Sequence, residues 1–143
     1  MILSICIPTY NRLENLDNCL NSILISSKNV KNFDFEVCIS DNFSDQNPQE
    51  IISKYSQYFK IIFNRNHRNL GFALNAIKTV KLSSAKYAWL IGNDDLILPE
   101  TLSNLKILFM ENTEIDYFFI NSYLINSKYL KNFKHPFDTF KLD

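Results

Sequence analysis

The sequence predicts an α/β fold, a three-layer α/β/α sandwich built on a mainly parallel sheet. Short apolar runs alternate with longer segments in which apolar residues recur at helical spacing, as expected for strands joined by crossover helices. The runs are continuous rather than alternating, which suits strands buried on both faces. With 143 residues, of which 46% are hydrophobic, the chain can bury an ordinary core without disulfides or metal ions.

Five apolar runs are predicted to be strands, each ended by turn-forming residues. The first run stops at Pro8, and the second is broken by a cluster of Ser, Asp and Asn over residues 40–45. A polar loop follows the third run, and a Gly-Asn-Asp-Asp loop follows the fourth. In chain order the predicted strands cover residues 3–7, 35–39, 60–63, 87–91 and 117–121.

Helices are predicted in the four segments that follow the first four strands. Asn11 is the expected N-cap of the first helix, with Glu14 three residues later as the partner of a capping box. Pro48 suits the first turn of the second helix, and Pro99 opens the fourth. The third is a short amphipathic helix around residues 74–81. Residues 1–123 are therefore predicted to form one domain, and residues 124–143 a tail or the start of a further half.

Composition and charge exclude several classes of protein. Fifteen Lys and Arg residues balance fifteen Asp and Glu residues, so the chain lacks the positive field of a nonspecific nucleic-acid binder. No apolar stretch approaches the roughly 18 residues of a membrane span. The three cysteines form no CxxC pair and fall in apolar runs, which predicts buried thiols. We therefore expect no nucleic-acid partner and a cytoplasmic location, with a peripheral position at the inner membrane left open.

Polar clusters follow each of the first four predicted strands. Any one of them could be ordinary turn and capping chemistry. Because the carboxyl ends of parallel strands share one edge of a sheet, where ligands bind, the four clusters together predict a ligand site there. The clusters cover residues 8–11, 40–42, 65–71 and 92–95.

Asp94 and Asp95 are adjacent carboxylates in the last of these clusters. Two like charges repel, and a divalent cation such as Mg²⁺ or Mn²⁺ would relieve the repulsion and leave open positions for substrate phosphates. The alternative is that one of the pair caps the helix near Pro99. A chain with two glycines carries neither GxGxxG nor GxxxxGK[ST], which excludes a Rossmann dehydrogenase and a P-loop NTPase.

Taken together, these motifs resemble the family-two inverting glycosyltransferases of the GT-A fold, over roughly residues 2–123. The resemblance implies that the sandwich is the Rossmann-like half of the enzyme that binds the nucleotide sugar. The matching segments cover residues 4–12, 39–45, 69–75 and 89–99.

The resemblance also implies roles for particular residues. The Thr and Tyr of the first segment would lie against the base and ribose, and the acid after the second strand would accept a hydrogen bond from the nucleobase. Two asparagines would line the nucleotide pocket. In chain order these substrate-binding positions are Pro8, Thr9, Tyr10, Asp41, Asn69 and Asn75.

The family's metal-binding D-x-D motif matches the fourth segment with one departure. Its first Asp is Gly92 here. Asp94 is therefore the expected metal ligand, with Asp95 as a second ligand or a loop support, and Asn93 as a substrate-binding position. The implied cofactor is Mn²⁺ or Mg²⁺. Arg65 and Arg68 are weaker candidates for a phosphate clamp, because a polar loop with cationic residues is usually just solvated.

The expected function is transfer of a sugar from a nucleotide-diphosphate donor to a glycan or lipid-linked acceptor. The resemblance places this reaction in bacterial surface glycan synthesis, such as that of lipopolysaccharide or capsule. A non-catalytic nucleotide-sugar-binding or interaction module remains the alternative, because the motifs supply neither an acceptor half nor a catalytic base. Self-association through an uncovered sheet edge is a further expectation.

Overall fold

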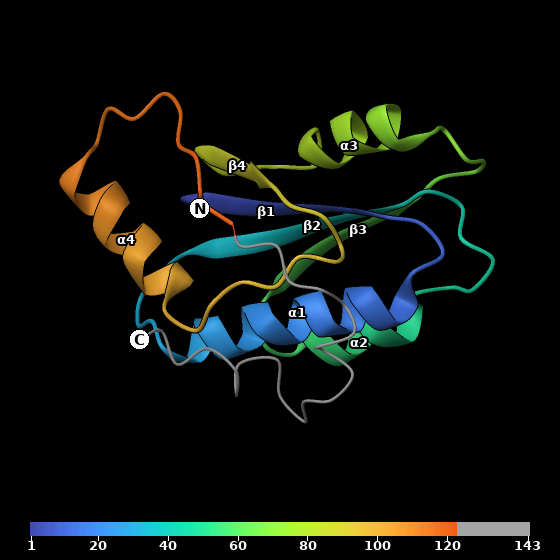
Figure 1. Cartoon of the computed structure of the whole chain (residues 1–143), viewed down its shortest axis with the longest axis horizontal. Helices are drawn as coiled ribbons and strands as arrows, with labels where there is room; N and C mark the ends of the chain where they lie inside the picture. Colours follow the sequence, from blue (N-terminus) through green and yellow to red (C-terminus); the bar gives the residue numbers. More distant parts are fainter. Residues whose placement is uncertain (123–143) are drawn as a thin grey trace. The chain divides into compact units, whose positions relative to one another are not determined.

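The structure, a computed structural model, describes residues 1–122, over which strands and helices alternate (Figure 1). Four strands and the first three helices follow one another in the predicted order, and a fourth helix comes after the last strand. The elements are β1 (Leu3–Thr9), α1 (Leu13–Lys28), β2 (Phe35–Asp41), α2 (Gln49–Ser56), β3 (Lys60–Arg65), α3 (Phe72–Val80), β4 (Tyr87–Leu90) and α4 (Thr101–Glu111).

The four strands form one parallel sheet in the order β3-β2-β1-β4. All seven residues of β1 are buried, as are six of the seven in β2, because both strands lie inside the sheet and are covered on both faces. In register, Thr9 lies opposite Asp41, and Asp41 opposite Arg65. The carboxyl ends of β1, β2 and β3 therefore lie side by side at one edge of the sheet.

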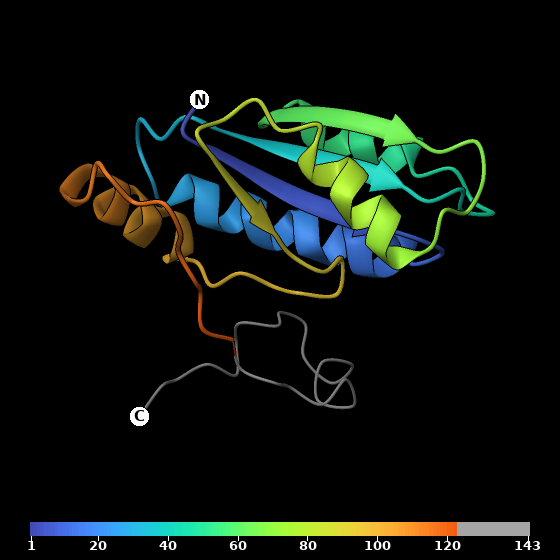
Figure 2. The same ribbon diagram turned by 90° about the horizontal axis from the view of Figure 1, so that it is seen from above.

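Helices cover both faces of the sheet. Figures 1 and 2 show α1 and α2 on one face and α3 on the other. The α1 layer contributes Leu16, Leu20 and Ile23 to the core, all fully buried. On the other face, Ala76 and Thr79 of α3 are buried. The prediction of a three-layer α/β sandwich with a parallel sheet is confirmed.

The loop between β1 and α1 differs from its prediction. Helix α1 begins at Leu13, with Arg12 at the cap position and no side-chain cap, so the prediction of Asn11 as N-cap was wrong. Asn11 has a positive φ of 52°, and its side-chain amide pairs with Asp45. The backbone N–H of Asp45 donates to Asn11 Oδ1 over 2.8 Å, and Asn11 Nδ2 donates to Asp45 Oδ2 over 3.1 Å. The amide thus clamps the loop after β1 to the loop after β2.

The predicted fifth strand at residues 117–121 is wrong. Among the described residues, this segment joins no sheet, and Tyr117 and Phe119 are exposed. A strand needs a neighbouring ladder for its hydrogen bonds, which an apolar run does not guarantee. By its contacts, the chain divides into Met1–Ile107, which holds the whole sheet, and Leu108–Asp143. The predicted tail at residues 124–143 lies outside the described residues.

Two further sequence expectations concern the cysteines and the membrane. Cys6, Cys19 and Cys38 are free and buried, as predicted. Cys6 and Cys38 lie opposite each other in the register of β1 and β2. Within the described part of the chain, no helix is long and apolar enough to cross a membrane.

A buried carboxylate joins three elements at the amino end of the sheet. Glu36 on β2 is fully buried and accepts a hydrogen bond of 2.8 Å from Ser4 Oγ on β1. It also accepts bonds from the backbone N–H and hydroxyl of Ser84, at 2.9 and 2.8 Å, and from Lys60 Nζ at 2.7 Å. Glu36 therefore ties β1, β3 and the segment before β4 together, at the end of the sheet away from the predicted site.

Candidate functional site

A cavity of about 330 Å³ opens at the carboxyl edge of the sheet. Its walls come from the end of β1, from the segments after β1, β2, β3 and β4, and from the start of α3. The polar clusters that the sequence singled out therefore meet in space. The lining residues are Pro8, Thr9, Tyr10, Arg12, Asn42, Asn69, Gly71, Phe72, Asn75, Gly92, Asn93 and Asp94.

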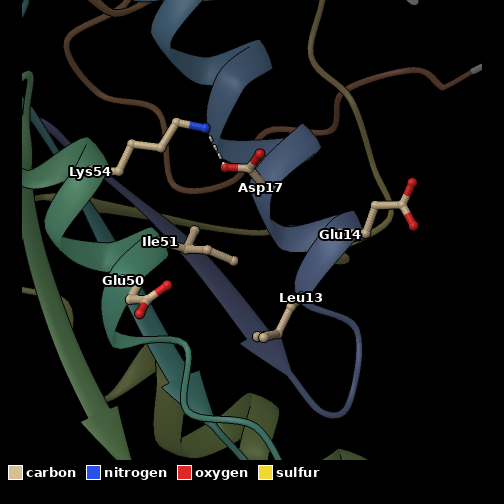
Figure 3. A pocket seen from close by; sticks show the side chains of 6 residues that line it. All are labelled: Leu13, Glu14, Asp17, Glu50, Ile51 and Lys54. Atoms are coloured by element: carbon tan, nitrogen blue, oxygen red, sulfur yellow. Dashed lines mark hydrogen bonds and ion pairs between the residues drawn. The ribbon is translucent and has the colours of Figure 1, made fainter.

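A second hollow, of about 350 Å³, lies between α1 and α2 (Figure 3). Leu13 and Ile51 give it an apolar part, and Lys54 pairs with Asp17 over 2.8 Å on one side. None of the residues that line it belongs to the polar clusters that follow the strands. We therefore place the candidate site in the cavity at the strand ends.

A buried hydrogen bond joins the two strands that flank the cavity. Asn93 Nδ2 donates to Thr9 Oγ1 over 2.8 Å, and both side chains are buried. This bond holds the loop after β4 against the end of β1, so the two walls have a defined separation. Tyr10, next to Thr9, is 44% exposed, and its ring is available to a ligand in the cavity.

A network of asparagine side chains builds the opposite wall. Asn42 Oδ1 accepts bonds from the backbone N–H of Leu70 at 2.9 Å and from Asn66 Nδ2 at 3.1 Å. Asn42 Nδ2 donates to Asn69 Oδ1 over 2.8 Å. Asn66 Nδ2 also donates to the Oδ1 of the buried Asn75, over 2.9 Å. The network therefore holds the loop before α3 in one shape, and Asn75 is a member of the network.

Sequence reasoning missed three members of these walls: Asn42, Asn66 and Arg12. Asn42 and Arg12 stood inside the quoted motifs, but no property of the sequence separated them from their neighbours. Asn66 lies in a run rich in asparagine, whose composition predicts a polar loop. Buried polar side chains are almost always hydrogen-bonded, so a run of asparagines between two apolar elements was the available signal.

Asp41 does not line the cavity. Its carboxylate is fully buried and accepts hydrogen bonds from the backbone N–H and the hydroxyl of Ser44. Arg65 Nε lies 3.3 Å from Asp41 Oδ2, and Arg65 also donates to the backbone carbonyl of Ser44. In this structure Asp41 and Arg65 brace the loop after β2. Direct contact of Asp41 with a nucleobase stays a prediction.

Asp41→Asn provides a test of the two roles. If Asp41 braces the loop, the substitution removes a buried charge facing Arg65 and should lower the free energy of unfolding by about 1–3 kcal/mol. Urea unfolding of both proteins measures this difference, with the exposed Asp116→Asn as a control. Unchanged stability together with weaker nucleotide binding would instead favour direct contact with the base.

The adjacent carboxylates are not left to repel each other, contrary to the expectation from the sequence. Asp94 Oδ2 pairs with Arg12 Nη1 over 2.9 Å, and Asp95 Oδ2 accepts the backbone N–H of Gly92 over 2.7 Å. Asp95 thus supports its own loop and does not line the cavity. A Cβ atom at Gly92 would lie 2.7 Å from Asp94 Oδ1. The carboxylate of Asp94 therefore occupies the space where a side chain at position 92 would start.

A buried thiol lies beneath this loop. Cys19 Sγ on α1 is 3.9 Å from the backbone carbonyl of Gly92. Burial, together with the negative charges of Asp95 and Asp94, raises the pKa of Cys19 to about 12. Cys19 is therefore a neutral packing residue under the Asp94 loop rather than a thiolate ligand.

The donor set of the cavity suits a hard divalent cation that is shared with a ligand. The side chain of Asp94 is exposed, and Asp94 is one of the residues that line the cavity. Nowhere in residues 1–122 do three or more His, Cys, Asp or Glu side chains gather as a metal cluster. Mg²⁺ and related cations often bind through one or two protein carboxylates and the phosphates of a substrate. The residues therefore fit a cation that a diphosphate helps to hold.

Comparison with known proteins agrees with this fold. The sequence model of Glycosyl transferase family 2 matches residues 4–141. The abequosyltransferase RfbV of Salmonella typhimurium is 41% identical over 108 residues, which are 74% of this chain and 32% of the relative. The chain belongs to glycosyl transferase family 2. It spans about a third of the length of this relative.

Solved structures share the fold. TarS of S. aureus, residues 1–349 in complex with UDP, aligns with a TM-score of 0.70 at 21% identity, covering 85% of this chain and 38% of that one. The mannosyltransferase PcManGT of Pyrobaculum calidifontis, in complex with GDP-Man and Mn²⁺, aligns with a TM-score of 0.62 at 15% identity. It covers 75% of this chain and 32% of that one. At such identities the likeness shows the GT-A fold, as the sequence motifs implied.

Proposed function

We propose that the cavity binds the nucleoside-diphosphate part of a sugar donor together with Mn²⁺ or Mg²⁺. The protein that contains this chain would transfer the sugar to a glycan or lipid-linked acceptor in bacterial surface glycan synthesis, on the cytoplasmic side of the inner membrane. The observation that carries the proposal is the meeting of Asp94 with the hydroxyl, amide and aromatic groups of three strand ends in one cavity.

The two walls of the cavity would contact different parts of the donor. Tyr10 presents an exposed ring on one wall, which suits stacking against a base or ribose. Asn69 and Gly71 form the opposite wall, and the asparagine network holds them in place. A preformed wall binds a ligand with little loss of conformational entropy, because its loop is already ordered.

Asp94 would hold the cation, with the neutral side chain of Asn93 beside it. A divalent cation bound there would neutralise negative charge on the departing diphosphate. Two hydrogen bonds hold the carboxylate of Asp94 in place. The bond from the Gly92 N–H to Asp95 fixes the shape of the loop after β4, and the bond from Asn93 to Thr9 fixes the distance between this loop and β1.

The alternative, a donor-binding module without turnover, has one observation in its favour. Among the described residues that line the cavity, Asp94 is the only carboxylate, so none is left to act as the general base. The chain spans a third of RfbV, and we propose that the acceptor side and the base belong to the remainder of the whole protein.

Ligand-dependent melting of the 143-residue chain tests the proposal. We expect Mn²⁺ together with UDP, CDP or GDP to raise the melting temperature by several degrees, and more than the two added separately. A ligand at 100 times its dissociation constant stabilises a protein by about 2.7 kcal/mol. The three nucleotides compare bases, and Mg²⁺ and Ca²⁺ compare cations. If no nucleotide shifts the melting temperature with any of these cations, the proposal is wrong.

A further inference from the structure

Arg12 and Asp94 form an ion pair across the candidate site. Of the described residues that line the cavity, Arg12 is the only basic side chain and Asp94 the only acidic one. Arg12 Nη1 lies 2.9 Å from Asp94 Oδ2, and the pair bridges the loops after β1 and β4. The carboxylate that suits a cation is therefore already neutralised by a residue of the protein.

We propose that Arg12 is a diphosphate-binding residue, which pairs with Asp94 in the empty site and exchanges this partner for the ligand's phosphate when nucleotide and cation bind together. The inference rests on the proposed function. It adds a residue to which neither the sequence motifs nor the comparisons assigned a role, and it makes the binding of the two ligands interdependent.

The ion pair is built to exchange. The side chains of Arg12 and Asp94 are 57% and 54% exposed, and such exposed pairs contribute little to stability. A guanidinium and a divalent cation cannot both sit close to one carboxylate oxygen without repelling each other. Binding of the cation to Asp94 therefore requires Arg12 to leave, at small cost.

The released guanidinium needs a new anion, and a diphosphate supplies one. The planar donors of Arg fit phosphate oxygens in a bidentate manner. The positive charges of the cation and Arg12 would then balance the negative charges of Asp94 and the diphosphate of a sugar nucleotide. With only one of the two ligands present, the cavity would hold an unbalanced charge, so each ligand should favour the other.

The backbone of Arg12 is held while its side chain is free to turn. The neighbouring Asn11 is tied to Asp45 through its amide, and its backbone N–H donates to Ser44 Oγ over 2.8 Å. The carbonyl of Arg12 accepts the N–H of Leu16 in the first turn of α1. The exchange of partners therefore needs only a side-chain rotation, with no movement of the loop.

Calorimetric titration of Arg12→Gln tests the exchange. The variant frees Asp94, so Mn²⁺ alone should bind about 3- to 10-fold more tightly than to the wild type. It also removes the phosphate contact, so UDP, CDP or GDP with saturating Mn²⁺ should bind at least about 10-fold more weakly. Arg12→Lys, which keeps the charge without the planar donors, should fall between. Changes of opposite sign for the two ligands are not expected from a merely structural residue.

Lys28→Gln is the control, since it removes a positive charge from an exposed residue at the end of α1 that does not line the cavity. If wild type binds nucleotide with Mn²⁺ but Arg12→Gln behaves like Lys28→Gln, the role of Arg12 is refuted and the proposed function stands. If wild type shows no Mn²⁺-dependent nucleotide binding, the proposed function is wrong, and the role of Arg12 that rests on it is wrong as well. Equal melting temperatures of the free variants would show that both fold.

Discussion

Asp94→Asn is expected to abolish the joint stabilisation by Mn²⁺ and a nucleoside diphosphate. The substitution keeps the shape of the side chain but replaces a charged ligand by a neutral amide, and hard cations prefer charged oxygen ligands. Loss of the charge should weaken Mn²⁺ binding in the presence of nucleotide by about 10- to 100-fold. This is the loss of affinity that corresponds to removing one interaction with a charged group. Melting curves with each ligand alone and with both measure the loss.

Two further variants make the result specific. Glu100→Gln removes an exposed carboxylate that does not line the cavity, and it should keep the joint effect of the two ligands. Asp95→Asn keeps an oxygen to accept the N–H of Gly92, so it should keep most of the effect if Asp95 is a loop support. Equal stabilisation of wild type and Asp94→Asn would remove Asp94 from the metal site. Equal losses in Asp94→Asn and Asp95→Asn would make both residues ligands.

Glu36→Ala is expected to be the most destabilising single substitution among those proposed, at about 3–5 kcal/mol. It leaves the buried hydroxyl of Ser4 and the N–H of Ser84 without their acceptor, and it removes the partner of Lys60. Glu36→Gln keeps an acceptor and should cost less, about 1–3 kcal/mol. Urea unfolding followed by the fluorescence of Trp89 measures both, with the exposed Glu50→Gln as a control.

The same carboxylate should make stability depend on pH in the acid range. Burial alone would raise the pKa of Glu36, but the hydrogen bonds from Lys60, Ser84 and Ser4 outweigh it and lower the pKa to about 2 from its ordinary 4.5. A lowered pKa in the folded state stabilises the protein above pH 4.5, and this contribution is lost as the pH falls from 4.5 towards 2. Unfolding measured across this window should have a shallower slope in Glu36→Gln than in wild type. Parallel slopes would contradict the network.

Local pattern was enough to predict the sheet but not its limits. The first four apolar runs became β1 to β4. A continuous apolar run suits a strand covered on both faces, which holds for β1 and β2, whereas the edge strands β3 and β4 are partly exposed. The run at residues 117–121 has the same pattern but joins no sheet in the described part of the chain. Whether a ladder exists beside a segment depends on the rest of the fold, which no local window contains.

The start of α1 differs from its prediction for a similar reason. Asn11 has the residue type of an N-cap, yet its side chain pairs with Asp45, which lies 34 residues further along the chain. A short polar side chain satisfies whichever partner the fold brings near it. The propensity of Asn11 was real, but the loop after β2 competed for its hydrogen bonds and the helix began at Leu13 without a side-chain cap.

The sequence by itself determined the family, the sheet and the edge at which the polar clusters meet, because these follow from apolar runs and from the order of strands and helices. Only the tertiary structure decided which residues line the cavity. Of two adjacent residues, Asn42 lines it and Asp41 is buried behind it, while Asp94 lines it and Asp95 supports the loop. The direction of a side chain in a turn depends on backbone dihedrals and on partners from other strands, such as Arg65 for Asp41 and Arg12 for Asp94. Residue types and spacing do not contain that information.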